Sequence, residues 1–478
     1  MGSSEAKRVG VLTLALINVA AVLGLRNLPA MAVYGWSSVG WYLLGTIAFL
    51  LPIALAGVEL STTWQKGGGL FGWVREAFGE EVGFFAIFCE WSNLLVWYPA
   101  VLAFIASTLA FAVNPDLASD NRFMFVVMMA VFWVSTGVAL FGSRASRLLG
   151  TFGVFAGTIV PALLICGFGI AFILSGERSE LPPFALGDLL PDFSLTTLPL
   201  AGVAILTFAG MEMIGFHAGD VRNPRRDLSR AMAVSAAIIF VLTVLGTLAV
   251  AWVVPKSQLS LAAGLMQAFS AFFDDFGVGW LLTPLALLVA LGAIACLQTW
   301  LTGPASGLHV AVNRGFMPPM FARLNRFGAP APVLLLQAGI GTVIAVAYLF
   351  APGINTVYWM LSAMTTLLIC IMYVAIFASF IRLRYVKPDV ERPFRVPGGM
   401  PGAWICGGLG AAACAATFFI SLLPPSEAQF GSTWTYVLVM LAGVAALTSP
   451  ALVLSWRTRA RRAARGAGHD DAEEGAGS

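Results

Sequence analysis

Long runs of apolar residues, each about the length of a membrane span, recur along the whole chain. A helix needs about 20 predominantly apolar residues to cross the ~30 Å hydrocarbon core of a bilayer. The pattern predicts twelve such helices, at 9–33, 38–63, 83–113, 122–142, 148–174, 197–220, 230–254, 278–308, 332–350, 354–382, 402–422 and 433–456. Two further segments, 69–78 and about 261–275, are too short and too charged to cross and are expected at the interface or as re-entrant helices.

The composition agrees with a multi-span helical membrane protein. Hydrophobic residues make up 59% of the chain and charged residues 11%, whereas soluble domains carry about 25% charged residues. The net charge of +3 gives no reason to expect a nucleic-acid partner. All six cysteines lie in apolar segments without paired spacing, which is typical of helix packing. No metal, cofactor or catalytic motif is found, so an enzyme is disfavoured.

The basic residues are distributed very unevenly between the two sides of the predicted membrane. Of the 27 Lys and Arg residues, Arg26 lies inside the first span, and Arg122, Arg178 and Lys256 lie on one side, which leaves 23 on the other. Because loops rich in Lys and Arg stay in the cytoplasm, both termini are predicted to be cytoplasmic. The protein is therefore expected to be a multi-pass protein of the cell (inner) membrane, in contact with the lipid bilayer.

The chain divides into five regions on this basis. Residues 1–8 form a cytoplasmic N-terminus, 9–382 a ten-helix core, 383–401 a cytoplasmic loop, 402–456 helices 11 and 12, and 457–478 a cytoplasmic tail. The tail ends in the sequence GAGHDDAEEGAGS, a Gly-rich acidic composition that predicts disorder. The oligomeric state is left open, since an apolar helix face looks the same toward lipid and toward a partner.

The most unusual stretch is 205–227, in which an apolar helix contains Gly210, Glu212 and His217. A carboxylate at bilayer depth costs at least ~2.5 kcal/mol on insertion scales, so it is paired, protonated or functional. A buried carboxylate is easier to protonate, which makes Glu212 a candidate coupling or gating acid. A carboxyl that only hydrogen-bonds between helices is the alternative. For His217 a pH-sensing role is the functional alternative to a simple interfacial histidine.

A second interruption is predicted in the first helix, where Gly24 precedes Arg26 and Pro29 follows it. Breaks in the first and sixth helices are corresponding positions of a 5+5 inverted repeat, and such paired breaks point to the binding site of a transporter. Backbone N–H groups exposed at a break can hold a carboxylate. Arg26 itself has three open roles: binding an acidic substrate, neutralising Glu212 or another buried acid, or reaching an interface.

Several motifs are similar to one known family, in the same order and spacing. They are GGGLFGWVREAFGEEVGF from residue 67, LPDFS at 190–194, AGME at 209–212 followed by VRNPRRD, LAAGLMQAF at 261–269, TGPASGL at 302–308, RPFRVPGG at 392–399 and SLLPP at 421–425. Over roughly 10–455 the chain resembles the amino acid–polyamine–organocation superfamily, and within it the bacterial glutamate/γ-aminobutyrate antiporters.

The resemblance implies an all-α fold of twelve helices, with helices 1–5 and 6–10 as inverted repeats, breaks in helices 1 and 6, and two extra helices. It also implies alternating access, with exchange or proton-coupled uptake of an amino acid or amine. The substrate-binding residues are then expected at the two breaks, namely Leu23, Gly24, Leu25, Arg26, Phe208, Ala209, Gly210 and Met211.

Three departures separate this chain from the glutamate/γ-aminobutyrate antiporters. Those proteins carry an acidic residue in the eighth helix about where this chain has Cys296, their first helix does not read GLRNLP, and their C-terminal plug is longer than the tail here. Glutamate/γ-aminobutyrate specificity and acid gating by the tail therefore do not follow from the resemblance. Alternatives to an amino-acid transporter are a polyamine or amine permease of the same fold, and a non-transporting nutrient sensor or subunit of a membrane complex.

Overall fold

The structure is a computed structural model, and it describes residues 10–64, 69–142, 153, 155–176, 179–191, 193–194, 198–212, 223–350, 353–424 and 432–476. Within these ranges the regular structure is helical throughout. The α-helices are α1 (Val11–Val22), α2 (Leu28–Ala32), α3 (Ser37–Gly45), α4 (Leu51–Thr63), α5 (Leu70–Phe78), α6 (Glu80–Val113), α7 (Asn121–Leu140), α9 (Val160–Leu174), α10 (Ala201–Thr207), α11 (Pro224–Val253), α12 (Gly264–Asp275), α13 (Leu282–Val312), α14 (Ala331–Ala345), α15 (Ala347–Phe350), α16 (Ile354–Val386), α17 (Gly399–Ile420) and α18 (Thr433–Ala476).

The described residues contain ten helices that are long and apolar enough to span a membrane, and an eleventh span if α1 and the bent segment after it count as one. These coincide with eleven of the twelve predicted spans. The twelfth, the sixth in chain order, is represented by α10 alone, because residues 213–222 lie outside the described part. The all-helical membrane fold is confirmed, whereas the count of twelve stays a prediction.

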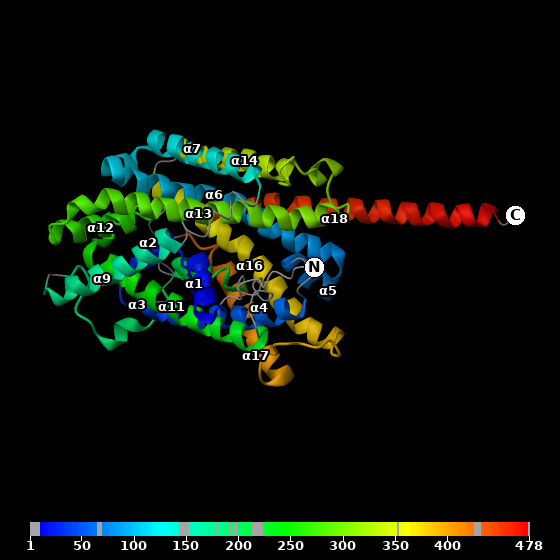
Figure 1. The fold of residues 1–478 in the computed structure, drawn as a ribbon, viewed down its shortest axis with the longest axis horizontal. Coiled ribbons are helices and arrows are strands. Elements are labelled where there is room, and N and C mark those ends of the chain that lie inside the picture. Colours follow the sequence, from blue (N-terminus) through cyan, green and yellow to red (C-terminus); the bar gives the residue numbers. More distant parts are fainter. Residues whose placement is uncertain are drawn as a thin grey trace, which may run out of the picture.

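The bundle is organised around α6, which packs against α13, α16, α5 and α18 and lies among them in Figure 1. In its most apolar stretch 89% of the residues are buried, compared with 22% for α18. Apolar residues on the outer helices can face lipid, so burial and not hydrophobicity distinguishes the centre of this bundle. The two short predicted segments are the helices α5 and α12, which pack against the ends of longer ones.

The C-terminal end differs from the prediction. The composition predicts a disordered tail from residue 457 onward, but α18 continues to Ala476 and reaches beyond the rest of the bundle (Figure 1). Ala and Arg dominate the stretch directly after Trp456, and both residue types favour helix. Local helix propensity, which the prediction from overall composition ignored, accounts for this difference.

Candidate functional site

The first predicted break is present. Helix α1 ends at Val22. The next two residues, Leu23 and Gly24, adopt non-helical backbone angles, and a single 3₁₀ turn at Leu25–Asn27 then leads into α2. The two halves meet at an angle of 44°. Gly24 weakens a helix and Pro29 supplies no N–H donor, so the local sequence favours an interruption. Within the described chain the N–H groups of Gly24, Leu25 and Arg26 donate no hydrogen bond.

The second predicted break begins where α10 ends at Thr207. Gly210 follows with a φ of 98°, in the left-handed region that favours glycine. Its N–H donates to the Tyr373 hydroxyl of α16 at 2.8 Å, so a backbone group released by the break is satisfied by a distant helix. The continuation through residue 222, including His217, lies outside the described residues.

The two breaks meet at one cavity of about 110 Å³. That volume is several times the ~10–15 Å³ that one water needs on this measure, so the cavity suits a small solute. Residues 20–27 form one wall, and Ala209 reaches it from the sixth helix. The remaining lining residues come from four other segments: Asn93, Leu94, Trp97, Val101, Phe104, Gly157, Thr158, Val289, Gly292, Ala293, Cys296, Trp300, Thr365 and Ile369.

Five of the eight predicted substrate-binding residues line this cavity: Leu23, Gly24, Leu25, Arg26 and Ala209. The other three are not among the residues that line it. Phe208 is fully buried and packs edge-on against Tyr42, and the Met211 sulfur accepts a hydrogen bond from Asn18 at 3.0 Å. Gly210 is next to Ala209. A Cβ added at Gly210 would lie at ordinary contact distances from the Trp300 and Val22 side chains.

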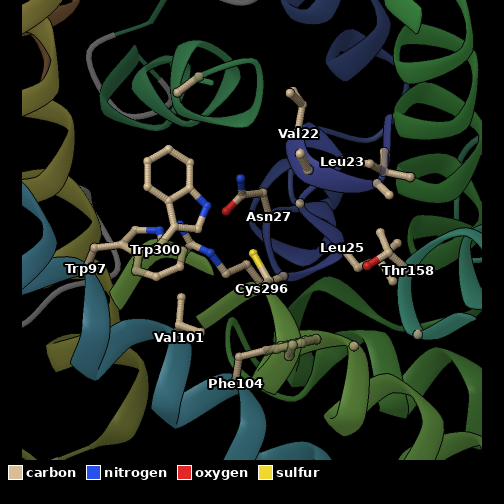
Figure 2. Close-up of a pocket in the computed structure, with 18 of the residues that line it drawn as sticks. Val22, Leu23, Leu25, Asn27, Trp97, Val101, Phe104, Thr158, Cys296 and Trp300 are labelled. Carbon is tan, nitrogen blue, oxygen red and sulfur yellow. The ribbon is translucent and has the colours of Figure 1, made fainter. Parts of the chain in front are cut away.

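Sequence reasoning missed the aromatic wall opposite the first break. Trp97 of α6 and Trp300 of α13 are neighbours, with ring centroids 6.0 Å apart. Figure 2 shows both rings beside Cys296, with the Asn27 amide facing them across the cavity. The spacing of Asn93, Trp97, Val101 and Phe104 along α6 places them on one helix face, a signal that could have identified this wall.

Arg26 is 9% exposed and belongs to the cavity wall. Its guanidinium lies over the Trp97 ring at 5.5 Å, and its main-chain oxygen accepts a hydrogen bond from Tyr358 at 3.2 Å. No carboxylate in the described part of the chain forms an ion pair with it. Of the three roles left open by the sequence, neutralising Glu212 and reaching an interface do not fit this position.

Glu212 is 8% exposed and is not among the residues that line the cavity. The Tyr373 hydroxyl donates to both of its carboxylate oxygens, at 3.1 and 3.2 Å. No Lys, Arg or His of the described residues forms an ion pair with it. Gly57 of α4 makes room for it, because a Cβ there would meet the Glu212 Cβ at 2.8 Å.

A second buried carboxylate, Glu59 in α4, has very different surroundings. Arg384 of α16 forms two hydrogen bonds to it, at 2.9 and 2.5 Å. The Arg392 Nε lies 3.3 Å from Oε1, the oxygen that also accepts from the Arg384 Nε. The Val396 N–H donates to it at 2.7 Å. These contacts tie α4 to α16 and to the loop that follows.

Comparison with known proteins places these features in context. Residues 9–445 match the family described as amino acid permease. An uncharacterized transporter from Legionella pneumophila is 35% identical over 442 residues, which is 92% of this chain and 94% of that protein. A glutamate/gamma-aminobutyrate antiporter from Lactococcus lactis is 29% identical over 91% of this chain and 88% of its own length. A probable agmatine/putrescine antiporter from the same species is 25% identical over 80% and 81%.

Proposed function

Because this chain belongs to the amino acid permease family, and is therefore a membrane transporter and not an enzyme, we propose that it carries its amino-acid or amine substrate in the cavity between the two breaks. The observation that carries the proposal is that residues 20–27 and Ala209 line one cavity. A non-transporting sensor, the alternative left open by the sequence, is not favoured by relatives named as antiporters.

The substrate's charged groups are held by backbone at the breaks. The N–H groups of Gly24, Leu25 and Arg26 have no partner in the described chain and stand at the positive end of a helical turn, which suits a carboxylate. The carbonyl groups that end α1 suit an ammonium group for the opposite reason. Trp97 and Trp300 cover the apolar part of the molecule. Phe208, expected to bind the substrate, packs against Tyr42 and is left in a supporting role.

Glu212 couples occupancy of the cavity to protonation. Its carboxylate has a hydroxyl partner and no cation in the described chain, so it can take up a proton without breaking an ion pair. The same Tyr373 hydroxyl accepts a hydrogen bond from the Gly210 N–H, and this bond connects the acid to the backbone of the break. Movement of this backbone during transport therefore alters the surroundings of Glu212. His217 remains a further gating candidate outside the described residues.

Transport takes place by alternating access across a cell membrane, in exchange for a second amino acid or amine, or together with protons. The antiporter names of two relatives support exchange. The excess of 23 basic residues on one side supports an inner-membrane protein with both termini in the cytoplasm. The five regions predicted from the sequence follow from the same orientation.

Counterflow in proteoliposomes tests this function. Vesicles loaded with one unlabelled amino acid or amine should accumulate the labelled form of a substrate, and the rate should depend on pH. In Glu212→Gln, exchange should continue while its pH dependence disappears, because the side chain can no longer gain or lose a proton. Glu81→Gln, an exposed carboxylate at the start of α6, is the matched control. An unchanged pH profile in Glu212→Gln would contradict the coupling role.

A further inference from the structure

We propose that Arg26 determines the substrate specificity of the cavity, and that the preferred substrate is an amino acid with a second, side-chain carboxylate. This inference rests on the proposed function, since it requires that a solute binds between the two breaks. It goes further by assigning the charge of that solute and the residue that recognises it.

The first argument is the charge of the cavity wall. Among the residues that line the cavity, Arg26 is the one with a charged side chain. A guanidinium stays protonated in proteins, and a buried charge without a counter-ion is costly. At 9% exposure water can provide little compensation. The wall therefore presents a fixed positive charge to whatever occupies the cavity.

The second argument is that the protein itself supplies no counter-ion from the described residues. Glu212 is held by Tyr373. Neither Glu212 nor Glu90, one helical turn before Asn93, lines the cavity. Neither acid forms an ion pair with Arg26.

The third argument is that Arg26 is held ready for a ligand. The Arg26 Cζ lies 5.5 Å from the centroid of the Trp97 ring, a distance at which the ring face attracts the cation. Its backbone is fixed by the Tyr358 hydroxyl. An oriented guanidinium presents parallel N–H donors that match the two oxygens of a carboxylate. Arg26 thus has the donor groups of a binding residue, and among the described residues it has no anionic partner.

These arguments distinguish three classes of substrate. A neutral amino acid satisfies the backbone groups with its ammonium and α-carboxylate but leaves Arg26 uncompensated. An amine cation adds a second positive charge to the same cavity, which is unfavourable. An amino acid such as glutamate or aspartate brings one more negative charge and neutralises Arg26 directly. The acidic class is therefore the one that completes the site.

The first experiment compares substrates of equal shape and different charge in the wild-type protein. Proteoliposomes loaded with glutamate are assayed for counterflow of labelled glutamate, with glutamine, aspartate, asparagine and putrescine as competitors. We expect glutamate to compete at least about 30-fold better than glutamine, the effect of leaving a buried charge unpaired. Equal competition by glutamine, or better competition by putrescine, overturns the proposal.

The screen also separates this proposal from the function on which it rests. If vesicles loaded with glutamine or putrescine support counterflow of their own labelled form and glutamate does not, the transporter function stands and the role of Arg26 is wrong. If none of these solutes exchanges in vesicles that hold folded protein, the proposed function fails, and the specificity falls with it.

The second experiment changes the charge at position 26. Arg26→Gln should reduce the preference for glutamate over glutamine to about equal, while Arg26→Lys should retain part of it because a point charge remains. Arg122→Gln, which removes an exposed arginine at the start of α7, should keep the wild-type ratio. The ratio between two substrates does not depend on how much protein folds, so a purely structural role for Arg26 would leave it unchanged.

A third measurement reports binding without transport. Cys296 lines the cavity and is partly exposed, whereas the other five cysteines are buried. Alkylation by N-ethylmaleimide should therefore occur first at Cys296, as mapped by mass spectrometry of the purified protein. Glutamate should slow this reaction and glutamine at the same concentration should not. Equal protection by both would contradict the assignment of an acidic substrate.

Discussion

Two buried carboxylates on neighbouring elements of this bundle have opposite surroundings. Glu59 is 1% exposed and is held by Arg384, Arg392 and a backbone N–H. Glu212 is 8% exposed and has the Tyr373 hydroxyl as its side-chain partner. Removing the charge of the first carboxylate would leave two guanidinium groups buried without compensation. The second has no cation among the described residues that depends on its charge.

If Glu212 is protonated during transport as proposed, one fold separates a fixed joint from a working acid. The Glu59 cluster joins α4, α16 and the loop before α17, and Arg384 also donates to the Gly399 oxygen at 2.7 Å. Glu212 is instead connected through the Tyr373 hydroxyl to the backbone of a broken helix. Burial alone does not distinguish them, so the identity of the partners is what assigns the role.

The largest expected effect comes from breaking the fixed joint. Glu59→Gln removes the charge that compensates Arg384 and Arg392, and it should lower the free energy of unfolding by about 3–5 kcal/mol. Thermal unfolding of the purified protein in detergent, followed by intrinsic fluorescence, measures this. Glu391 is an exposed acid in the loop that contains Arg392, and Glu391→Gln should have almost no effect. A Glu59→Gln protein as stable as the wild type would remove the contrast between the two acids.

Gly57→Ala tests how closely Glu212 is packed. The added Cβ would lie 2.8 Å from the Glu212 Cβ and 3.0 Å from its Cα, and such overpacking costs about 1–3 kcal/mol. Thermal unfolding in detergent should show a lower unfolding temperature, and the proteoliposome assay should show slower counterflow. The control is Gly137→Ala in α7, where a Cβ meets nothing within 4 Å and a better helix former should be neutral or slightly stabilising. Equal behaviour of the two variants would argue against the close approach.

Tyr373→Phe removes the hydroxyl that Glu212 and Gly210 share. One buried N–H and one carboxylate lose a partner, so stability should fall by about 1–3 kcal/mol. The pH at which counterflow changes should also move, because the hydroxyl stabilises the ionised acid. Tyr385→Phe, at an exposed residue farther along α16, serves as the comparison. A pH profile identical to that of the wild type would separate Tyr373 from proton coupling.

The smallest effect is expected at Glu76 in α5, a surface counterpart of Glu59. Lys387 and Arg75 hold the pKa of this carboxyl below its usual value. Its contribution to stability is therefore present above the usual carboxyl pKa and is lost as the pH falls through the lowered one. Because the group is partly exposed, the loss in Glu76→Gln at pH 7 should be below about 1 kcal/mol. Unfolding temperatures of both proteins between pH 3 and pH 7 should converge at the acidic end.

The sequence by itself predicted much of the architecture. Hydrophobic runs located the spans because lipid requires each to be a self-satisfied helix, and Gly24, Pro29 and Gly210 located the breaks because glycine and proline act on their own backbone. The family resemblance placed the substrate-binding residues at these breaks, and of them Leu23 to Arg26 and Ala209 line the cavity. Such features depend on residues close together in the chain, so the local sequence determines them.

Tertiary structure decided which charges have partners. Glu59 meets Arg384 across 325 positions, and Glu212 meets Tyr373 across 161. The sequence alone could not tell a paired acid from a free one, or place Arg26 over Trp97 and apart from Glu212. The tail also formed a helix where composition predicted disorder. Coulomb energy and hydrogen bonding act over a few ångströms, so these roles are determined only when the bundle brings distant residues together.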